Sequence, residues 1–234
     1  MIVPTASGTL DNRSMSKRTY RQNCPLACAL DIVGERWTFL ILRELSYGPQ
    51  RYNQMLERFR GIGTNLLAAR LKHLTAARII RHRRQGPVAT GTVYELTETG
   101  QELLPALFML ARWGSRHATS RGSEVRPTVR WGIFALTARH RPQIAKRTRL
   151  VAEFRFGGSA HTIRVDRGRV DSAPSSAETP DVRVTGEKSA FLDVAYGRRA
   201  LEEAIVARKL KIEGDRSAVR SFVAVFGLNE KLAA

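Results

Sequence analysis

Arginine and lysine are concentrated between Arg51 and Arg84, where nine basic residues stand against one acid, Glu57. Guanidinium and ammonium groups on a small folded unit bind phosphates, and each such contact releases counterions from a nucleic acid. The chemistry indicated is therefore binding of a phosphate backbone. A solvated basic surface that binds nothing is the simpler alternative, and the helical spacing of the same segment argues against it.

Other site chemistries have less support. The two cysteines, Cys24 and Cys28, lie four residues apart. Two cysteines are too few for a disulfide framework, and no Cys or His spacing elsewhere completes a zinc site. The five histidines are scattered, and no nucleophile–base pair or paired carboxylates can be placed together. We therefore expect no enzyme activity, no metal and no cofactor.

The net charge of +18 is unevenly distributed along the 234 residues. Residues 1–120 carry net +9 and residues 126–149 net +7, whereas residues 150–234 carry only net +2. This asymmetry favours two domains that bind partners of different kinds. A lipid-transfer protein whose basic half meets anionic membranes is a competing hypothesis, but no basic amphipathic surface helix supports it and no apolar run could span a bilayer.

The first twenty residues are rich in Ser, Thr, Asn, Arg and Lys and have no apolar segment like that of a signal peptide. We expect residues 1–20 to form a flexible arm, with Met15 as an alternative start, and the protein to be cytoplasmic.

Helical spacing predicts four helices between Pro25 and residue 77, the first opened by a proline at its first position and the fourth capped by Thr64. Their predicted inward stripes are Leu26, Ala29, Leu30 and Val33; Trp37, Leu40, Ile41 and Leu45; Tyr52, Met55, Leu56 and Phe59; and Leu67, Leu71 and Leu74. Residues 79–84 and 92–96 then flank Gly86-Pro87, which predicts a β-hairpin with a basic tip.

A helix that enters the major groove presents its exposed N-terminal positions to base edges, and a basic hairpin beside it contacts phosphates. Arg70 is ambiguous, because it could instead brace the fourth helix through an ion pair. The predicted DNA-contacting residues are Arg51, Thr64, Asn65, Ala68, Ala69, Arg70, Lys72, Arg81, Arg83 and Arg84.

A long helix is predicted from Thr97-Glu98 onward. It carries more apolar surface than the core of a small domain needs, which suggests a dimer interface. The apolar residues in question are Leu103, Leu104, Leu107, Phe108, Leu110 and Trp113.

Three runs, "CPLACALDIVGERWTFLILRELSYGPQRYNQML", "GIGTNLLAARLKHLTAARIIRH" and "VYELTETGQELLPALFMLARWG", resemble the HxlR-type winged helix-turn-helix regulators of bacteria over about residues 20–115. The resemblance implies a homodimer paired through its N-terminal and last helices that binds an inverted repeat in a promoter. It also implies a recognition helix at 64–77 and a wing at 81–93. Two departures from the family pattern are Ala68-Ala69, where polar residues are usual, and Arg78, where glycine is usual.

Cys24 matches the position of a cysteine that some members of this family use to sense oxidants, quinones or aldehydes. A helix N-terminus near Arg21 favours the reactive thiolate. The alternative is a small residue buried in the dimer interface. Cys28, one turn further on, is expected to pack in the apolar stripe.

Beyond a linker at residues 116–128, Val129, Ile133 and Leu136 predict a helix. Strands are expected near 150–156, 163–165, 182–184 and 210–212, with helices around 191–192 and 201–205 and after Asp215. The run "DVRVTGEKSAFLDVAYGRRALEEAIVARKLKIEGDRSAVRSFVAVF" resembles the sterol-carrier-protein-type fold over about residues 150–227, which implies an apolar tunnel for a lipid-like molecule. The candidate ligand contacts are Phe154, Phe156, Phe191, Leu192, Leu201, Phe222 and Phe226. Alternatively, the same side chains simply fill a core.

The sequence thus predicts an α+β chain with a winged-helix domain at 21–115 and a sterol-carrier-like domain at 129–234. The function expected is that of a dimeric repressor of transcription that binds double-stranded DNA and responds to a small hydrophobic ligand. The alternative is a regulator switched by oxidants or electrophiles through Cys24, with a second domain that is only structural.

Overall fold

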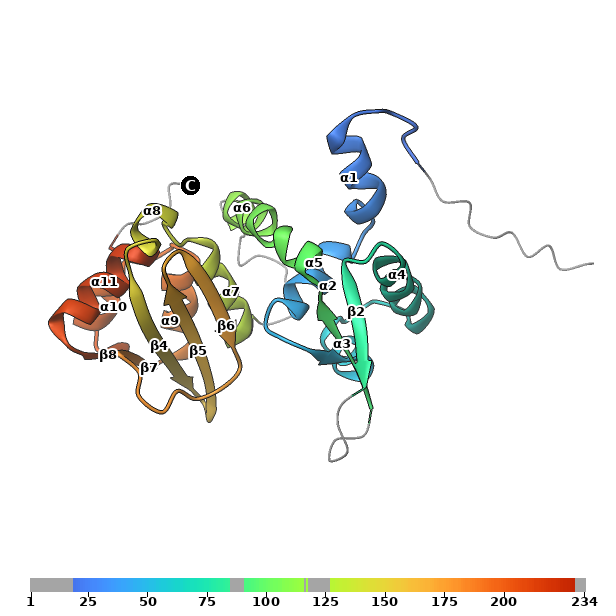
Figure 1. Cartoon of the computed structure of the whole chain (residues 1–234). Helices are drawn as coiled ribbons and strands as arrows, with labels where there is room; N and C mark the ends of the chain where they lie inside the picture. The colour runs from blue at the N-terminus through green and yellow to red at the C-terminus, as the bar shows by residue number, and fades with distance from the viewer. Residues whose placement is uncertain (1–18, 85–90, 116, 118–126, 230–234) are drawn as a thin grey trace, which may run out of the picture.

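The computed structural model describes residues 19–84, 91–115, 117 and 127–229, which form two α+β units (Figure 1). The predicted fold class is therefore confirmed. The predicted arm except for residues 19 and 20, the tip of the wing and most of the linker lie outside the described residues. Among the helices described, none has the length and apolar content needed to cross a membrane.

The first unit combines six helices with a small antiparallel sheet in the order β1-β3-β2. Its core contains the predicted stripe of Leu67, Leu71 and Leu74, all of which are buried. The elements are α1 (Pro25–Val33), α2 (Thr38–Leu45), β1 (Gln50–Arg51), α3 (Tyr52–Arg58), α4 (Thr64–Ala76), β2 (Ile80–Arg84), β3 (Thr92–Leu96), α5 (Glu98–Glu102) and α6 (Leu104–Ser115).

Two helix starts differ from the prediction. Gly63, not Thr64, occupies the N-cap position of α4, and no side chain caps it. Trp37 lies before α2 in a left-handed conformation, with φ 78°. Ile41 and Leu45 of α2 are buried as predicted, and Leu42 is also buried, whereas Leu40 is 40% exposed.

The predicted long helix after Thr97 is broken into α5 and α6 at Leu103. Pro105 has no N–H to donate to the carbonyl group of Gln101, so the helical hydrogen-bond pattern cannot continue through this point. The break lets α6 pack against the second unit, where Phe108 contacts Phe134 with ring centroids 5.3 Å apart.

The second unit is a five-stranded sheet, ordered β6-β5-β4-β7-β8, in which only β4 and β7 are parallel. Strand β6 was not predicted, because this edge strand is exposed or half-buried throughout and lacks apolar alternation. The elements are α7 (Val129–Ala138), α8 (Pro142–Ala145), β4 (Arg149–Phe156), β5 (Ser159–Asp166), β6 (Arg169–Ala173), β7 (Val182–Gly186), α9 (Lys188–Ala195), α10 (Leu201–Val206), β8 (Leu210–Gly214) and α11 (Arg216–Phe226).

The aromatic side chains of this unit pack against one another between the sheet and the helices. Phe154 lies 5.5 Å from Phe191 and 6.0 Å from Phe222, and Phe156 stacks on Phe191 at 4.8 Å. All seven candidate ligand contacts are buried, with at most 8% exposed. This packing favours the interpretation that the seven side chains fill a core, since a ligand between these rings would have to separate them.

Glu153 lies on the face of the sheet opposite these aromatic side chains. It is fully buried and accepts hydrogen bonds from Arg183 Nε at 2.7 Å, Ser176 Oγ at 2.6 Å and the Ala177 backbone N–H at 3.1 Å. Burial by itself raises the pKa of this carboxyl, but the bonds from Arg155, Ser176 and Arg183 outweigh it and lower the pKa to about 2.

Because this pKa is depressed from 4.5 to about 2, Glu153 stabilises the fold at neutral pH and the stabilisation is lost as the pH falls through that interval. We expect Glu153→Gln to be less stable than wild type at pH 7 and to have a flatter stability profile between pH 4.5 and pH 2. Urea unfolding across this range measures both effects. The exposed neighbour Glu178→Gln is the control, and identical profiles for Glu153→Gln and wild type would contradict the assignment.

Candidate nucleic-acid interface

One side of α4 is exposed at the surface of its domain. Five of the predicted DNA contacts share this side and are exposed, opposite the buried leucine stripe: Thr64, Asn65, Ala68, Ala69 and Lys72. We call them the recognition face. Its two alanines cannot form hydrogen bonds to bases through their side chains, so their methyl groups offer apolar contact, which suits thymine methyl groups.

Arg70 points away from that side. Its Nη2 forms an ion pair with Glu35 in the α1–α2 connection at 2.7 Å, and the side chain is only 14% exposed. The structure therefore places Arg70 in the bracing position that the sequence left open.

The wing arginines divide between two faces of the β2–β3 hairpin. Successive side chains on a strand alternate, so His82 and Arg84 lie on one face with their cross-strand partners, whereas Arg81 and Arg83 lie on the other. Arg81 and Arg83 share Glu95 at 2.7 and 3.3 Å. Partial burial raises the pKa of Glu95, but these two hydrogen bonds keep it below its usual value. Arg84 forms no ion pair within the described part of the chain.

Arg51 joins the wing to α3. Its backbone N–H donates to Gln54 Oε1 at 3.0 Å at the start of the helix, and its guanidinium lies beside Gly91, just before β3. Strand β1, which contains Arg51, pairs with β3 (Arg51 opposite Val93). The sequence did not predict β1, because two residues are too few to show any alternation.

A groove of about 410 Å³ separates α4 from the wing strands. This groove was not predicted from the sequence, although the shared strand face of His82 and Arg84 was a usable signal. Its lining residues are Tyr52, Ala68, Lys72, Thr75, Ala76, His82 and Tyr94.

Arg78 connects α4 to the wing in a left-handed conformation, with φ 59°. Glycine adopts this backbone region without steric cost, which explains why glycine is usual at this position; the structure offers no reason for arginine here.

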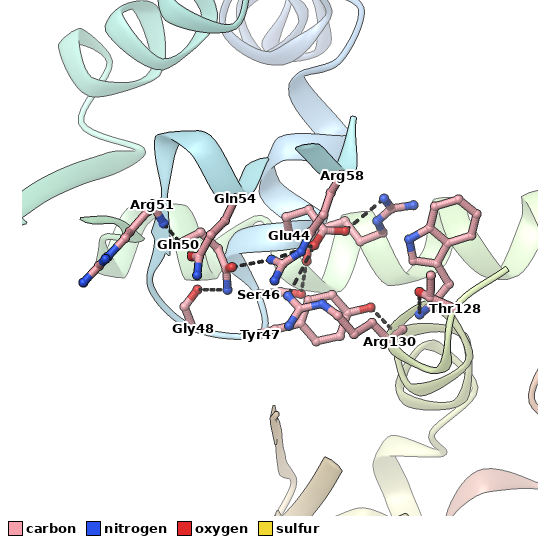
Figure 2. A network of polar contacts seen from close by, with 12 residues as sticks. Glu44, Ser46, Tyr47, Gly48, Gln50, Arg51, Gln54, Arg58, Thr128 and Arg130 are labelled. Carbon is pink, nitrogen blue, oxygen red and sulfur yellow. Dashed lines mark hydrogen bonds and ion pairs between the residues drawn. The ribbon is translucent and has the colours of Figure 1, made fainter. Parts of the chain in front are cut away.

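A buried carboxylate links the two units (Figure 2). Glu44 of α2 is 1% exposed and lies 3.0 Å from Arg43 Nη2, 3.7 Å from Arg58 Nη1 and 3.3 Å from Arg130 Nη2 of α7. Arg58 in turn donates a hydrogen bond to Gln50 of β1. A continuous set of contacts therefore runs from α7 to the strand that holds Arg51.

Tyr47 completes this junction. Its hydroxyl donates to the backbone carbonyl of Arg130, and the Arg130 guanidinium lies 4.1 Å from the centroid of the Tyr47 ring. Arg43 lies over Trp131 at 4.8 Å. The first turn of α7 is thus held by ion pairs, a hydrogen bond and ring contacts. No pattern in the sequence predicted this role for Glu44 or Tyr47.

The basic segment at residues 126–149, here called the basic connector, is partly structural. Arg139 is buried, and its guanidinium donates to the backbone carbonyls of Val194 and Gly227, both at 2.7 Å. Arg130 is likewise held at the junction. Two of the seven basic residues of the connector are therefore not available to bind a polyanion.

Both cysteines are exposed and free in the protomer. The expectation that Cys28 packs in the apolar stripe is wrong for the single chain, because α1 buries Ala27 and Val33 instead. Leu26 on α1 is exposed, as are Met109, Leu110 and Trp113 on α6. These two helices therefore carry an uncovered apolar surface.

A helix-turn-helix with an exposed, acid-free helix face and an arginine-bearing β-hairpin wing is a DNA-binding architecture. The chain belongs to the HxlR-like helix-turn-helix family, whose sequence model matches residues 32–122. A second model, that of the SCP-2 sterol transfer family, matches residues 135–227. Neither family description is that of an enzyme.

Several relatives are named as uncharacterised HTH-type transcriptional regulators. One from Mycobacterium tuberculosis is 38% identical over 89 residues, which cover 38% of this chain and 56% of that protein. One from Synechocystis is 33% identical over 39% of this chain and 68% of its own length. The chain thus spans about half the length of the mycobacterial relatives that it matches.

Two solved structures also resemble the chain. The transcription factor PA1607 is 30% identical, covering 46% of this chain and 75% of its own, with a TM-score of 0.39. The reduced form of the transcriptional regulator YodB from B. subtilis is 29% identical, covering 44% of this chain and 100% of its own, with a TM-score of 0.36.

Proposed function

We propose that the protein is a DNA-binding transcriptional regulator that acts as a repressor by occupying an inverted repeat in a promoter. The observation that carries this proposal is the recognition face, which is exposed, contains no acid and is flanked by Arg84 of the wing. Phosphate contacts supply affinity and base contacts supply specificity, and these surfaces offer groups for both.

The regulator would act as a homodimer. The exposed apolar surface on α1 and α6 supports pairing through these helices, because such side chains are usually covered by a partner. A two-fold dimer places its two recognition helices in successive major grooves, about 34–36 Å apart.

A small hydrophobic effector in the second unit would alter DNA binding through α7. His161 supports this route, since it is buried opposite Phe154 in the sheet and neither ring nitrogen has a hydrogen-bond partner among the described residues. Burial and the positive charge of Arg130 lower the pKa of His161 to about 4, so it stays neutral and can donate to or accept from a polar group on the effector. An effector that separates the rings near His161 would disturb Arg130 and hence Glu44.

The alternative is a switch at Cys24, favoured by its exposure at the start of α1, one of the two helices of the proposed dimer interface. Modification there by an electrophile would alter helix pairing. We expect Cys24→Ser to lose any response of DNA affinity to diamide or a quinone while keeping the response to an apolar ligand. A full response to diamide in Cys24→Ser, with Cys28 intact, would exclude this alternative.

Arg84→Ala tests the wing assignment. Because Arg84 has no acidic partner among the described residues, its loss should weaken binding to all duplexes about equally and reduce the slope of log K against log [salt] by about 0.9. Fluorescence anisotropy on two unrelated duplexes at several salt concentrations measures both. Arg216→Ala, an exposed arginine of the second unit, is the matched control. An unchanged slope for Arg84→Ala would remove Arg84 from the interface.

A further inference from the structure

The groove between α4 and the wing has walls from both elements that would contact DNA. Ala68 and Lys72 belong to its lining and also to the recognition face. A duplex that lies against the recognition face therefore covers the groove as well. What the groove can hold is decided by the chemistry of its walls.

We propose that this groove, here called the wing groove, binds one phosphate and the adjoining deoxyribose of the DNA backbone. The proposal rests on the proposed DNA-binding function and adds three contacts that the sequence analysis did not identify: Tyr94, His82 and Ala76.

The charge of the wing groove suits a single phosphate. Lys72 supplies the one ammonium group among the residues that line the groove, and none of these residues has a carboxylate. Lys72 forms no ion pair in the described part of the chain. Arg84 follows His82 on the same face of β2 and places a second cation beside the groove. Arg81 and Arg83 cannot serve here, because they lie on the opposite face and share Glu95.

Hydroxyl and ring groups complete the phosphate contact. The Tyr52 hydroxyl is already used, since it donates to the carbonyl of Thr64 at 2.8 Å and holds the wall in place. The half-buried Tyr94 has no hydrogen bond to its hydroxyl among the described residues, and its ring meets His82 edge-on at 6.5 Å. The Tyr94 hydroxyl is therefore available to donate to a phosphate oxygen.

The remaining walls suit a sugar better than a base edge. Base readout requires donors and acceptors in the pattern of a particular base pair, and the side chains of Ala68 and Ala76 supply none. Their methyl groups, with the methyl group of Thr75, form an apolar wall against which a deoxyribose can pack. The contact would therefore fix the position of the protein on DNA without selecting a sequence.

Filling the wing groove without changing its charge tests the proposal directly. Ala76 is exposed, so Ala76→Phe in the full-length chain should fold with an unchanged melting temperature but bind a fluorescent 24-base-pair duplex at least tenfold more weakly. Two independent variants remove the contacts themselves. Lys72→Ala should lower the salt slope by about 0.9, and Tyr94→Phe should weaken binding about threefold to tenfold with an unchanged slope. Ala207→Phe and Lys188→Ala, on exposed sites of the second unit, are the controls.

The outcomes separate the wing groove from DNA binding in general. If wild type binds duplexes and Ala76→Phe, Lys72→Ala and Tyr94→Phe bind them equally well, the wing-groove proposal is overturned while the proposed function stands. Losses confined to one of several duplex sequences would also overturn it, since they would mean that the groove reads bases. A third result would assign the groove to a small aromatic anion instead. In that case sodium benzoate would inhibit duplex binding by wild type but not by Ala76→Phe, and Ala76→Phe without benzoate would bind the duplex as tightly as wild type. If wild type binds no duplex, the proposed function fails first.

Discussion

Replacing Met109 by glutamate is expected to separate the proposed dimer and to reduce affinity for a duplex with two half-sites by more than about a hundredfold. Met109 is 74% exposed in the protomer and lies on α6 with Leu110 and Trp113. A carboxylate there would be buried without a partner when two copies pair, which disfavours association. A single chain binds only one half-site, so it loses the gain in affinity that comes from binding two half-sites at once. In linked systems this gain is about 10²–10⁴-fold.

Because Met109 is exposed in the single chain, the substitution should leave the protomer folded. Sedimentation equilibrium gives the oligomeric state, and anisotropy with a duplex that carries an inverted repeat from the protein's own upstream region gives the affinity. Val206→Glu is the matched control, since Val206 is 77% exposed on the second unit, away from α1 and α6. A Met109→Glu protein that stays dimeric and binds like wild type would place the dimer interface elsewhere.

Glu44→Ala is expected to have the largest effect on stability, about 3–5 kcal/mol, because removing one partner of a buried ion pair leaves charges without compensation. The side chains of Arg43 and Arg130 are only 15% and 14% exposed, and no other carboxylate within the described residues pairs with either of them. The loss would also detach the first turn of α7 from α2 and release Arg58, which positions β1 through Gln50.

Urea unfolding of the full chain measures the stability of the junction. Asp166→Ala supplies the control, because it removes only exposed ion pairs, with Arg149 and Arg167, each worth at most about 1 kcal/mol. A second measurement, duplex affinity in conditions where Glu44→Ala stays folded, reports whether the junction also positions the wing. Equal unfolding free energies for Glu44→Ala and Asp166→Ala would contradict the described junction.

The sequence predicted elements whose signal is local and periodic. The leucine stripe of α4, the wing strands and the alternation in β4 depend on spacings that directly determine which side of an element is buried. The breaks were harder to predict. The α5–α6 boundary depends on Pro105, and α2 begins after a left-handed Trp37, neither of which alters the apolar count.

The candidate site was predicted as a set of residues but not as a geometry. Spacing placed Asn65 and Lys72 on one side of a helix, yet it could not show that Arg70 forms an ion pair with Glu35 or that Arg81 and Arg83 share Glu95. Such pairings join residues far apart in the sequence, and single-sequence periodicity contains no information about them. The junction at Glu44 was missed for the same reason.

The most direct test is a salt titration of the purified full-length protein against duplex DNA. If the recognition face and wing bind a phosphate backbone, the protein binds duplexes in dilute salt, and log K falls linearly with log [salt]. Each phosphate contacted adds about 0.9 to the steepness of this fall. If no duplex of any sequence binds even in dilute salt, the chain is not a DNA-binding protein and the regulatory role proposed for it is wrong.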